Sequence, residues 1–134
     1  MPTMLLRAFA VWLIIMLAET VHGILRGVIL VPAVGDRTSR QFGVFIGSAI
    51  IFAIAYIFID WFGRDATISR LLLIGFLWVI ATVVFEFALG RLLGLSWDRL
   101  LEDYRLAEGG LMPIGLVLMF LSPLLAKILR SRSP

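Results

Sequence analysis

The sequence predicts an all-α integral membrane protein folded as a bundle of four transmembrane helices. Of its 134 residues, 61% are hydrophobic and 16% are charged, whereas a typical soluble domain is roughly 45–50% apolar. Residues 42–59 and 109–126 each run 18 positions without a charge, about the length that a bilayer requires of a spanning helix. Two more apolar segments are each interrupted by a single glutamate.

Composition also excludes several classes of function. With a mean hydropathy of +1.05, the chain has too little polar surface for a soluble enzyme. The net charge of +3 comes from basic residues scattered between apolar stretches, which argues against nucleic-acid binding. The absence of cysteine excludes disulfides and thiolate metal sites. The expected partners are the lipid bilayer and either further copies of the chain or a larger membrane complex.

We expect one membrane domain over residues 1–134, with spans at residues 4–30, 41–61, 69–93 and 109–129. The first span resembles a secretory signal in its early part, but Met16 stands where a small residue should precede the cleavage position at Ala18. It is therefore interpreted as a retained helix. The connections at residues 35–40 and 63–67 are too short to fold separately and indicate a compact bundle.

The longer third connection predicts an amphipathic helix. Ser96 is a suitable N-cap, and apolar side chains follow at i, i+3, i+4 and i+7 opposite a charged face. These apolar residues are Trp97, Leu100, Leu101 and Tyr104. Gly109-Gly110 should end the segment. The helix lies either on the membrane surface, where Trp and Tyr are favoured, or against the loops of a partner.

Four spans place both termini on one side of the membrane. Lysine and arginine residues number six on the terminal side and six on the other, which sets no orientation. If Arg26 and Arg91 lie partly within the membrane, the terminal side leads by six to four, and the positive-inside rule then places both termini in the cytoplasm.

A nine-residue pattern occurs twice, 67 positions apart. Glu19 to Gly27 and Glu86 to Gly94 both read E-x-x-x-G-x-L-x-G, so residues 1–67 and 68–134 could be two tandem helical hairpins related by an axis along the membrane normal. Glycines four apart allow close helix packing, either within the bundle or between two copies. The candidate packing glycines are Gly23, Gly27, Gly43, Gly47, Gly90 and Gly94.

The two glutamates of this repeat are the main functional candidates. Glu19 and Glu86 fall about 6–8 Å beyond the bilayer centre, where a charged side chain costs roughly 2.5–3.5 kcal/mol. Each therefore needs a partner or a proton. Glu19, His22 and Arg26 share one helix face. The candidate ion pairs are Arg26 with Glu86 and Arg91 with Glu19, and a purely structural network of these groups is an equal alternative.

Three functions suit a cluster of Glu19, His22, Arg26, Glu86 and Arg91. The first is proton-coupled transport or conduction of an ion or small solute, in an oligomer. The second is a metal- or haem-binding redox subunit. The third is a non-catalytic assembly subunit. The sequence contains no soluble-enzyme motif, so an enzymatic role is less favoured.

The redox alternative depends on a site shared between two chains. Glu19-x-x-His22 has the i, i+3 spacing of di-metal helical bundles, and Glu86 would add a ligand from another helix. A homodimer would supply the full set. A haem with His22 as its axial ligand needs a second histidine from a symmetry-related chain, or a methionine such as Met16 or Met119.

Overall fold

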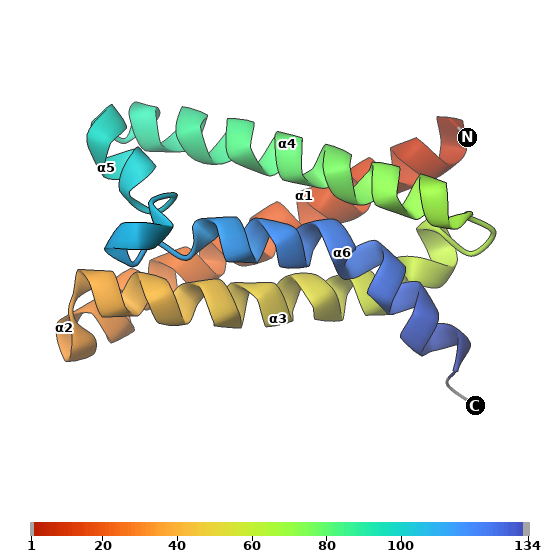
Figure 1. Ribbon diagram of the computed structural model, residues 1–134, viewed down its shortest axis with the longest axis horizontal. Coiled ribbons are helices and arrows are strands. Elements are labelled where there is room, and N and C mark those ends of the chain that lie inside the picture. Colours follow the sequence, from red (N-terminus) through yellow and green to blue (C-terminus); the bar gives the residue numbers. More distant parts are fainter. Residues whose placement is uncertain (1, 133–134) are drawn as a thin grey trace.

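The computed structural model describes residues 2–132 and confirms the four-helix membrane bundle, with no strand in that range. Four helical segments are long and apolar enough to cross a membrane, which indicates an integral membrane protein. The elements are α1 Pro2–Leu25, the π-helical turn Arg26–Leu30, α2 Val31–Val34, α3 Asp36–Phe62, α4 Ile68–Leu92, α5 Trp97–Glu102, a 3-10 turn Leu106–Glu108 and α6 Met112–Ser131. The N-terminal end and the C-terminal end of the described chain lie at one end of the bundle, and α2 and α5 lie at the other (Figure 1).

The first connection is shorter than predicted. The first span continues to Val34, and α3 already begins at Asp36, so Gly35 is the single residue between them. Gly35 has a φ of 87°, a left-handed backbone that glycine adopts without steric cost. The carboxylate of Asp36 lies in the first turn of α3, where the helix dipole favours a negative charge. The expected loop at residues 35–40 is therefore wrong, because its polar residues form the first turn of a helix.

The apolar core fills the half of the bundle nearest the termini. Among the described residues, eight of its side chains are at most 1% exposed, and they come from all four spanning segments: Val11, Ile15, Ala55, Ile59, Leu71, Ile74, Met119 and Ala126. Two tryptophans join α1 to α4 through hydrogen bonds inside this core. The indole of Trp12 donates to Thr82 Oγ1 over 3.0 Å, and the indole of Trp78 donates to the Ala8 carbonyl over 3.0 Å.

The closest approach of two helices occurs at a glycine outside the predicted set. A Cβ atom at Gly75 of α4 would lie 2.0 Å from the carbonyl oxygen of Phe120 in α6. A few residues further on, α6 bends (Figure 1) at Pro123, which removes a helical hydrogen bond. Ser122 Oγ donates to the Leu118 carbonyl over 2.7 Å. The backbones of α4 and α6 thus approach each other closely at Gly75.

The predicted packing glycines have different surroundings in the single chain. Nothing lies within 4 Å of a Cβ built at Gly23 or Gly27, or at Gly94, which has a φ of 86° just beyond the end of α4. Gly90 faces the side chain of Leu100 in α5. None of these four brings two helix backbones together within one chain.

A short helix, α5, follows the third span as predicted. The Oγ of Ser96 accepts a hydrogen bond from the Arg99 backbone N–H over 3.1 Å and so caps α5. The helix itself is shorter than its apolar pattern, since α5 ends at Glu102 and a 3-10 turn follows. Gly109, with a φ of 87°, terminates that turn. Tyr104 therefore lies in the connection and not on the helix.

The α4–α6 contact can be tested with matched glycine variants. We expect Gly75→Ala to destabilise the protein by about 1–3 kcal/mol, because its methyl group can be placed only if α4 and α6 move apart. Gly23→Ala, which has open space around it, should leave stability unchanged or slightly raise it. The measurement is the thermal unfolding midpoint in mild detergent. Equal midpoints for the two variants would contradict the contact.

Candidate functional site

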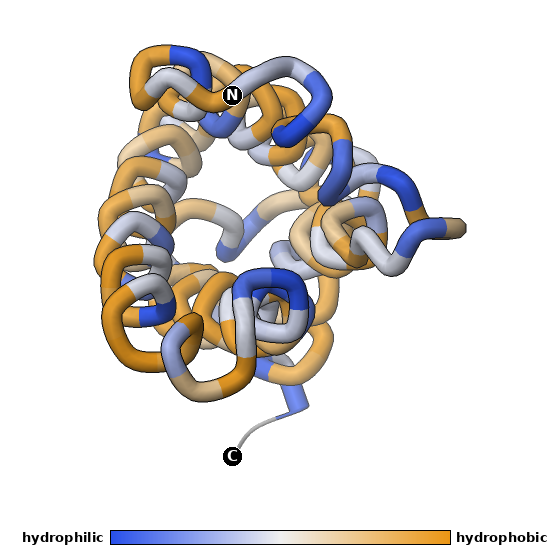
Figure 2. The backbone as a smooth tube through the Cα atoms, turned by 90° about the vertical axis from the view of Figure 1, so that its left-hand side faces the viewer, coloured by the Kyte–Doolittle hydropathy of each residue, from blue (hydrophilic) through white to orange (hydrophobic). Residues whose placement is uncertain are grey.

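A cavity of about 660 Å³ occupies the end of the bundle that carries α2 and α5. All four spanning segments contribute to its wall, and the view along the bundle (Figure 2) shows the helices arranged around this region. Its inner part is largely apolar and ends against Met16, Ile51 and Met119. Beyond these side chains lies the packed core, so in this conformation the cavity opens toward one end of the bundle and is closed toward the other.

The predicted polar stripe of the first span faces this cavity. Glu19, His22 and Arg26 all line it, and His22 Nδ1 lies 3.6 Å from Glu19 Oε2. Glycines of α3 make room for these side chains. A Cβ at Gly47 would lie 2.7 Å from Glu19 Oε2, and one at Gly43 would lie 2.8 Å from Arg26 Cδ. Gly43 and Gly47 therefore accommodate polar side chains and do not pack against a helix backbone.

Neither predicted ion pair forms in the described part of the chain. Glu86 lines the same cavity as Arg26, but Arg26 Nη1 donates to Ser39 Oγ over 3.1 Å. Arg91 does not line the cavity. Its guanidinium donates to the Leu95 carbonyl over 3.1 Å and lies 4.9 Å from the ring centroid of Trp97. The structure thus brings Glu19, His22, Arg26 and Glu86 to one cavity and leaves Arg91 on the outside.

These groups do not form the buried cluster that the sequence predicts. The side chains of His22 and Glu19 retain 15% and 20% exposure, and Glu86 is exposed, because each faces open cavity space. Glu19 Oε1 and His22 Nε2 have no hydrogen-bond partner among residues 2–132. Within the same range, no three His, Asp or Glu side chains approach closely enough to hold a metal ion. One chain therefore does not assemble the predicted Glu19, His22 and Glu86 metal site.

The methionines predicted as haem ligands pack at the inner end of the cavity. Met16 and Met119 are both buried, and the sulfur of Met119 accepts a hydrogen bond from the Thr82 hydroxyl over 3.3 Å. Both methionines belong to the packing at the inner end of the cavity. They therefore close the cavity in this structure, and no contact directs either sulfur toward His22.

Sequence reasoning missed an ionic cluster at the mouth of the cavity. Arg40 of α3 contacts Asp36 over 3.1 Å and Glu102 over 3.2 Å, and it also hydrogen-bonds Asp103. Arg99 lies 3.5 Å from Asp36 and 3.6 Å from Asp103. The cluster holds α5 and the segment after it against the start of α3. The i, i+4 spacing of Asp36 and Arg40 gave a local signal, but the acidic partners lie more than 60 residues away.

Tyr104 lies behind this cluster. Its hydroxyl is buried and has no hydrogen-bond partner among the described residues. Burial, together with the neighbouring carboxylates of Glu86 and Asp103, raises the pKa of Tyr104 to about 12. The ring lies 5.4 Å from that of Phe87, so the side chain packs the connection against α4.

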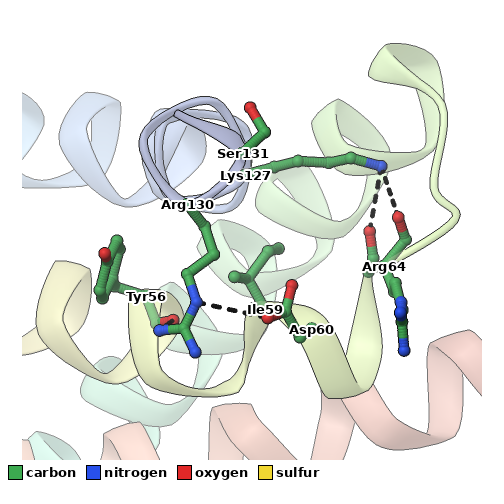
Figure 3. A pocket seen from close by; sticks show the side chains of 8 residues that line it. Tyr56, Ile59, Asp60, Arg64, Lys127, Arg130 and Ser131 are labelled. Atoms are coloured by element: carbon green, nitrogen blue, oxygen red, sulfur yellow. Dashed lines mark hydrogen bonds and ion pairs between the residues drawn. The ribbon is translucent and has the colours of Figure 1, made fainter. Parts of the chain in front are cut away.

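A second cavity, of about 620 Å³, lies at the other end of the bundle. The Nζ of Lys127 donates to the carbonyl of Arg64 over 2.9 Å (Figure 3). It also donates to the carbonyls of Gly63 and Ala66 over 3.3 and 2.7 Å. Arg130 lies 3.3 Å from Asp60 and 5.0 Å from the ring centroid of Tyr56. These contacts connect α6 to α3 and to the segment that follows α3, so the residues of this second cavity have a structural role.

No known family model, curated protein or solved structure matches the sequence. The function is therefore argued from the chemistry of the polar cavity, since chemistry resides in sites and not in folds.

The ionic cluster at the cavity mouth can be tested at Arg40. Arg40→Gln leaves three carboxylates without their shared cation, and we expect a loss of about 1–2 kcal/mol of stability. Amide hydrogen exchange should accelerate in residues 97–110. Arg70→Gln is the control, because Arg70 is exposed at the other end of the bundle and its replacement should change neither quantity. Unchanged exchange in Arg40→Gln would exclude its role as the anchor of α5.

The environment of Tyr104 predicts how stability depends on alkaline pH. The folded pKa of Tyr104, about 12, exceeds the unfolded value of about 10. The contribution of the neutral phenol to folding stability is therefore fully present below about pH 10 and is lost as pH rises toward 12. Tyrosinate absorbance at 295 nm should show a late titration that disappears in Tyr104→Phe and persists in Tyr56→Phe. A single early transition in the wild type would contradict this environment.

Proposed function

We propose that the chain transports an ion or small solute in exchange for, or together with, a proton, and that the polar cavity is its substrate site. The observation that carries this proposal is the meeting of three titratable side chains from two spans in one open cavity. Glu19 and His22 come from the first span and Glu86 from α4. At membrane depth, carboxyl and imidazole groups are expensive as charges and are commonly retained for ion or proton pathways.

Unpartnered polar atoms support this role. Glu19 Oε1 and His22 Nε2 find no hydrogen-bond partner among residues 2–132, whereas polar groups in a structural network are normally satisfied. Both atoms are buried beside the cavity in this conformation, so a proton or a solute that reaches them would satisfy groups that are costly to leave unpaired. The second cavity shows the contrasting case, since Lys127 and Arg130 there both have partners.

One-sided access is the second supporting observation. The cavity opens at the α2 and α5 end and stops at the core around Met16 and Met119. A transporter alternates between two such states, each open to one side.

The proposal is tested by proton flux in liposomes that contain a trapped pH-sensitive dye. Inorganic cations, organic amines, carboxylates and sulfonates are added one class at a time, and at least one class should drive proton movement. Glu19→Gln keeps the size of the side chain but cannot bind a proton, so we expect the coupled flux to fall at least about tenfold. Glu108→Gln, at an exposed acid outside the cavity, is the control. Unchanged flux in Glu19→Gln would remove that residue from the coupling.

A further inference from the structure

We propose that the substrate is an amphiphile with an anionic head group, which enters the cavity sideways from the bilayer between α1 and α4 and binds through Arg26 and Arg37. This inference names the substrate class of the transporter proposed above and rests on that proposed function. It combines three features of the same cavity, which are two arginines without an acidic partner, an apolar inner wall and an opening at membrane depth.

The two arginines supply the anion site. Arg26 and Arg37 both line the cavity, and among the residues that the structure describes neither has an acidic group within 4.0 Å. Arg26 bonds only to the Ser39 hydroxyl, and Arg37 lies beside the turn at Gly109. The neighbouring Arg40 and Arg99 are committed to the ionic cluster. Guanidinium groups bind phosphate, sulfonate or carboxylate oxygens in a bidentate geometry.

The inner wall suits a hydrocarbon chain. Below the arginines the cavity is lined by Ile51 of α3, Phe85 of α4 and Leu116 of α6, and it ends at buried methionines. Sites that bury most of an apolar ligand have walls of this kind, with a few polar groups that fix its orientation. An anion without a chain would leave this wall unfilled.

The cavity opens to the side between α1 and α4. The two helices are held together near their N-terminal halves by Trp12 and Trp78, and they diverge toward the α2 and α5 end (Figure 1). Along this divergence Gly23 has nothing within 4 Å of its Cβ position. Ile24 and Leu93 line the cavity and are also 61% and 71% exposed, which marks them as the rim. A molecule dissolved in the bilayer can pass this rim without crossing the polar mouth.

The carboxyl groups of the cavity couple an anion to protons. Glu19 and Glu86 share it with the bound head group, and ionised carboxylates repel an anion. Binding of the anion therefore favours uptake of protons by these groups, and by linkage protons favour the anion, which corresponds to symport. The other charged or titratable groups near them are His22, Arg26, Arg37, Arg40, Arg99, Glu102, Asp103 and Tyr104, while α6 contributes none to the cavity wall.

The probe is a decyl sulfonate that carries a photoreactive diazirine on its chain, incorporated into phosphatidylcholine liposomes with the purified protein. A sulfonate does not titrate near neutral pH, so any proton uptake on binding belongs to the protein. Cross-linked residues are located by mass spectrometry. We expect them on the cavity faces of α1, α4 and α6, with labelling reduced about tenfold or more in Arg37→Gln and largely retained in Arg37→Lys. Arg70→Gln, an exposed arginine at the opposite end, is the control.

Three results would overturn the inference. The first is cross-linking restricted to the lipid-facing surface, or equal in Arg37→Gln and wild type. The second is competition by methanesulfonate as effective as that by unlabelled decyl sulfonate, which would assign the site to a soluble anion. The third is stronger competition by decyltrimethylammonium, which would assign it to a cation.

Proton uptake separates this inference from the proposed function. In weakly buffered detergent solution, decyl sulfonate should cause proton uptake by the wild type and little uptake by the double variant Glu19→Gln, Glu86→Gln. Arginine-dependent cross-linking without proton uptake would support the amphiphile site and contradict the coupling. Glutamate-dependent flux of another solute, without cross-linking in the cavity, would support the proposed transport function and contradict an amphiphilic substrate.

Discussion

The hydrogen bonds of Trp12 and Trp78 are the interaction on which the shape of the molecule depends. They hold α1 against α4 in one half of the bundle, where hydrocarbon offers no other partner to an indole N–H. Because that contact lies in the middle part of α1 and α4, the ends of the two helices toward α2 and α5 can separate. The contact between α1 and α4 therefore determines both the position of the packed core and the position of the open cavity.

Charged residues along the first span are also distributed according to whether they lie beside the packed core or beside the cavity. Arg7, near the terminal end, donates to the Trp61 carbonyl over 3.0 Å, and the following turns are apolar and bury one face. Glu19 is the first ionisable group beyond the crossing, and His22 and Arg26 follow toward the interface on the same face. Charged side chains thus begin where the helices diverge, because only there does the bundle leave space for groups that need solvation or a ligand.

Most of the fold could be predicted from local sequence properties. Hydropathy located the spans, and the short-range signals at Ser96 and Gly109 located the interfacial turn, because each depends on neighbouring residues. The prediction of a loop at residues 35–40 was wrong because these polar residues form the first turn of α3. Only the backbone conformation at Gly35 reveals that start. The Gly75 contact was missed because α6 lies far away in sequence, and no spacing within α4 indicates which glycine it meets.

Only part of the site could be predicted, because helical periodicity describes one helix at a time. Helical periodicity placed Glu19, His22 and Arg26 on one face, and repeat symmetry pointed to Glu86 at the same depth. Pairing between helices could not be read from periodicity, so Arg26 was assigned to Glu86 when Ser39 was its partner. Arg91 is likewise predicted to pair with Glu19, but it lies beside Trp97.

The π-helical turn at Arg26–Leu30 has a consequence for how the chain enters α3. A π-turn accommodates one residue more than an α-turn, and one residue corresponds to about 100° of rotation around a helix axis. The five residues from Arg26 to Leu30 therefore set the azimuth at which Val31–Val34 leaves the first span and reverses at Gly35. If they wound as an ordinary α-helix, Asp36 would start α3 on a different side of the bundle, away from the arginine and acidic residues that hold it in place. The irregular turn acts as a spacer that keeps two regular helices in phase.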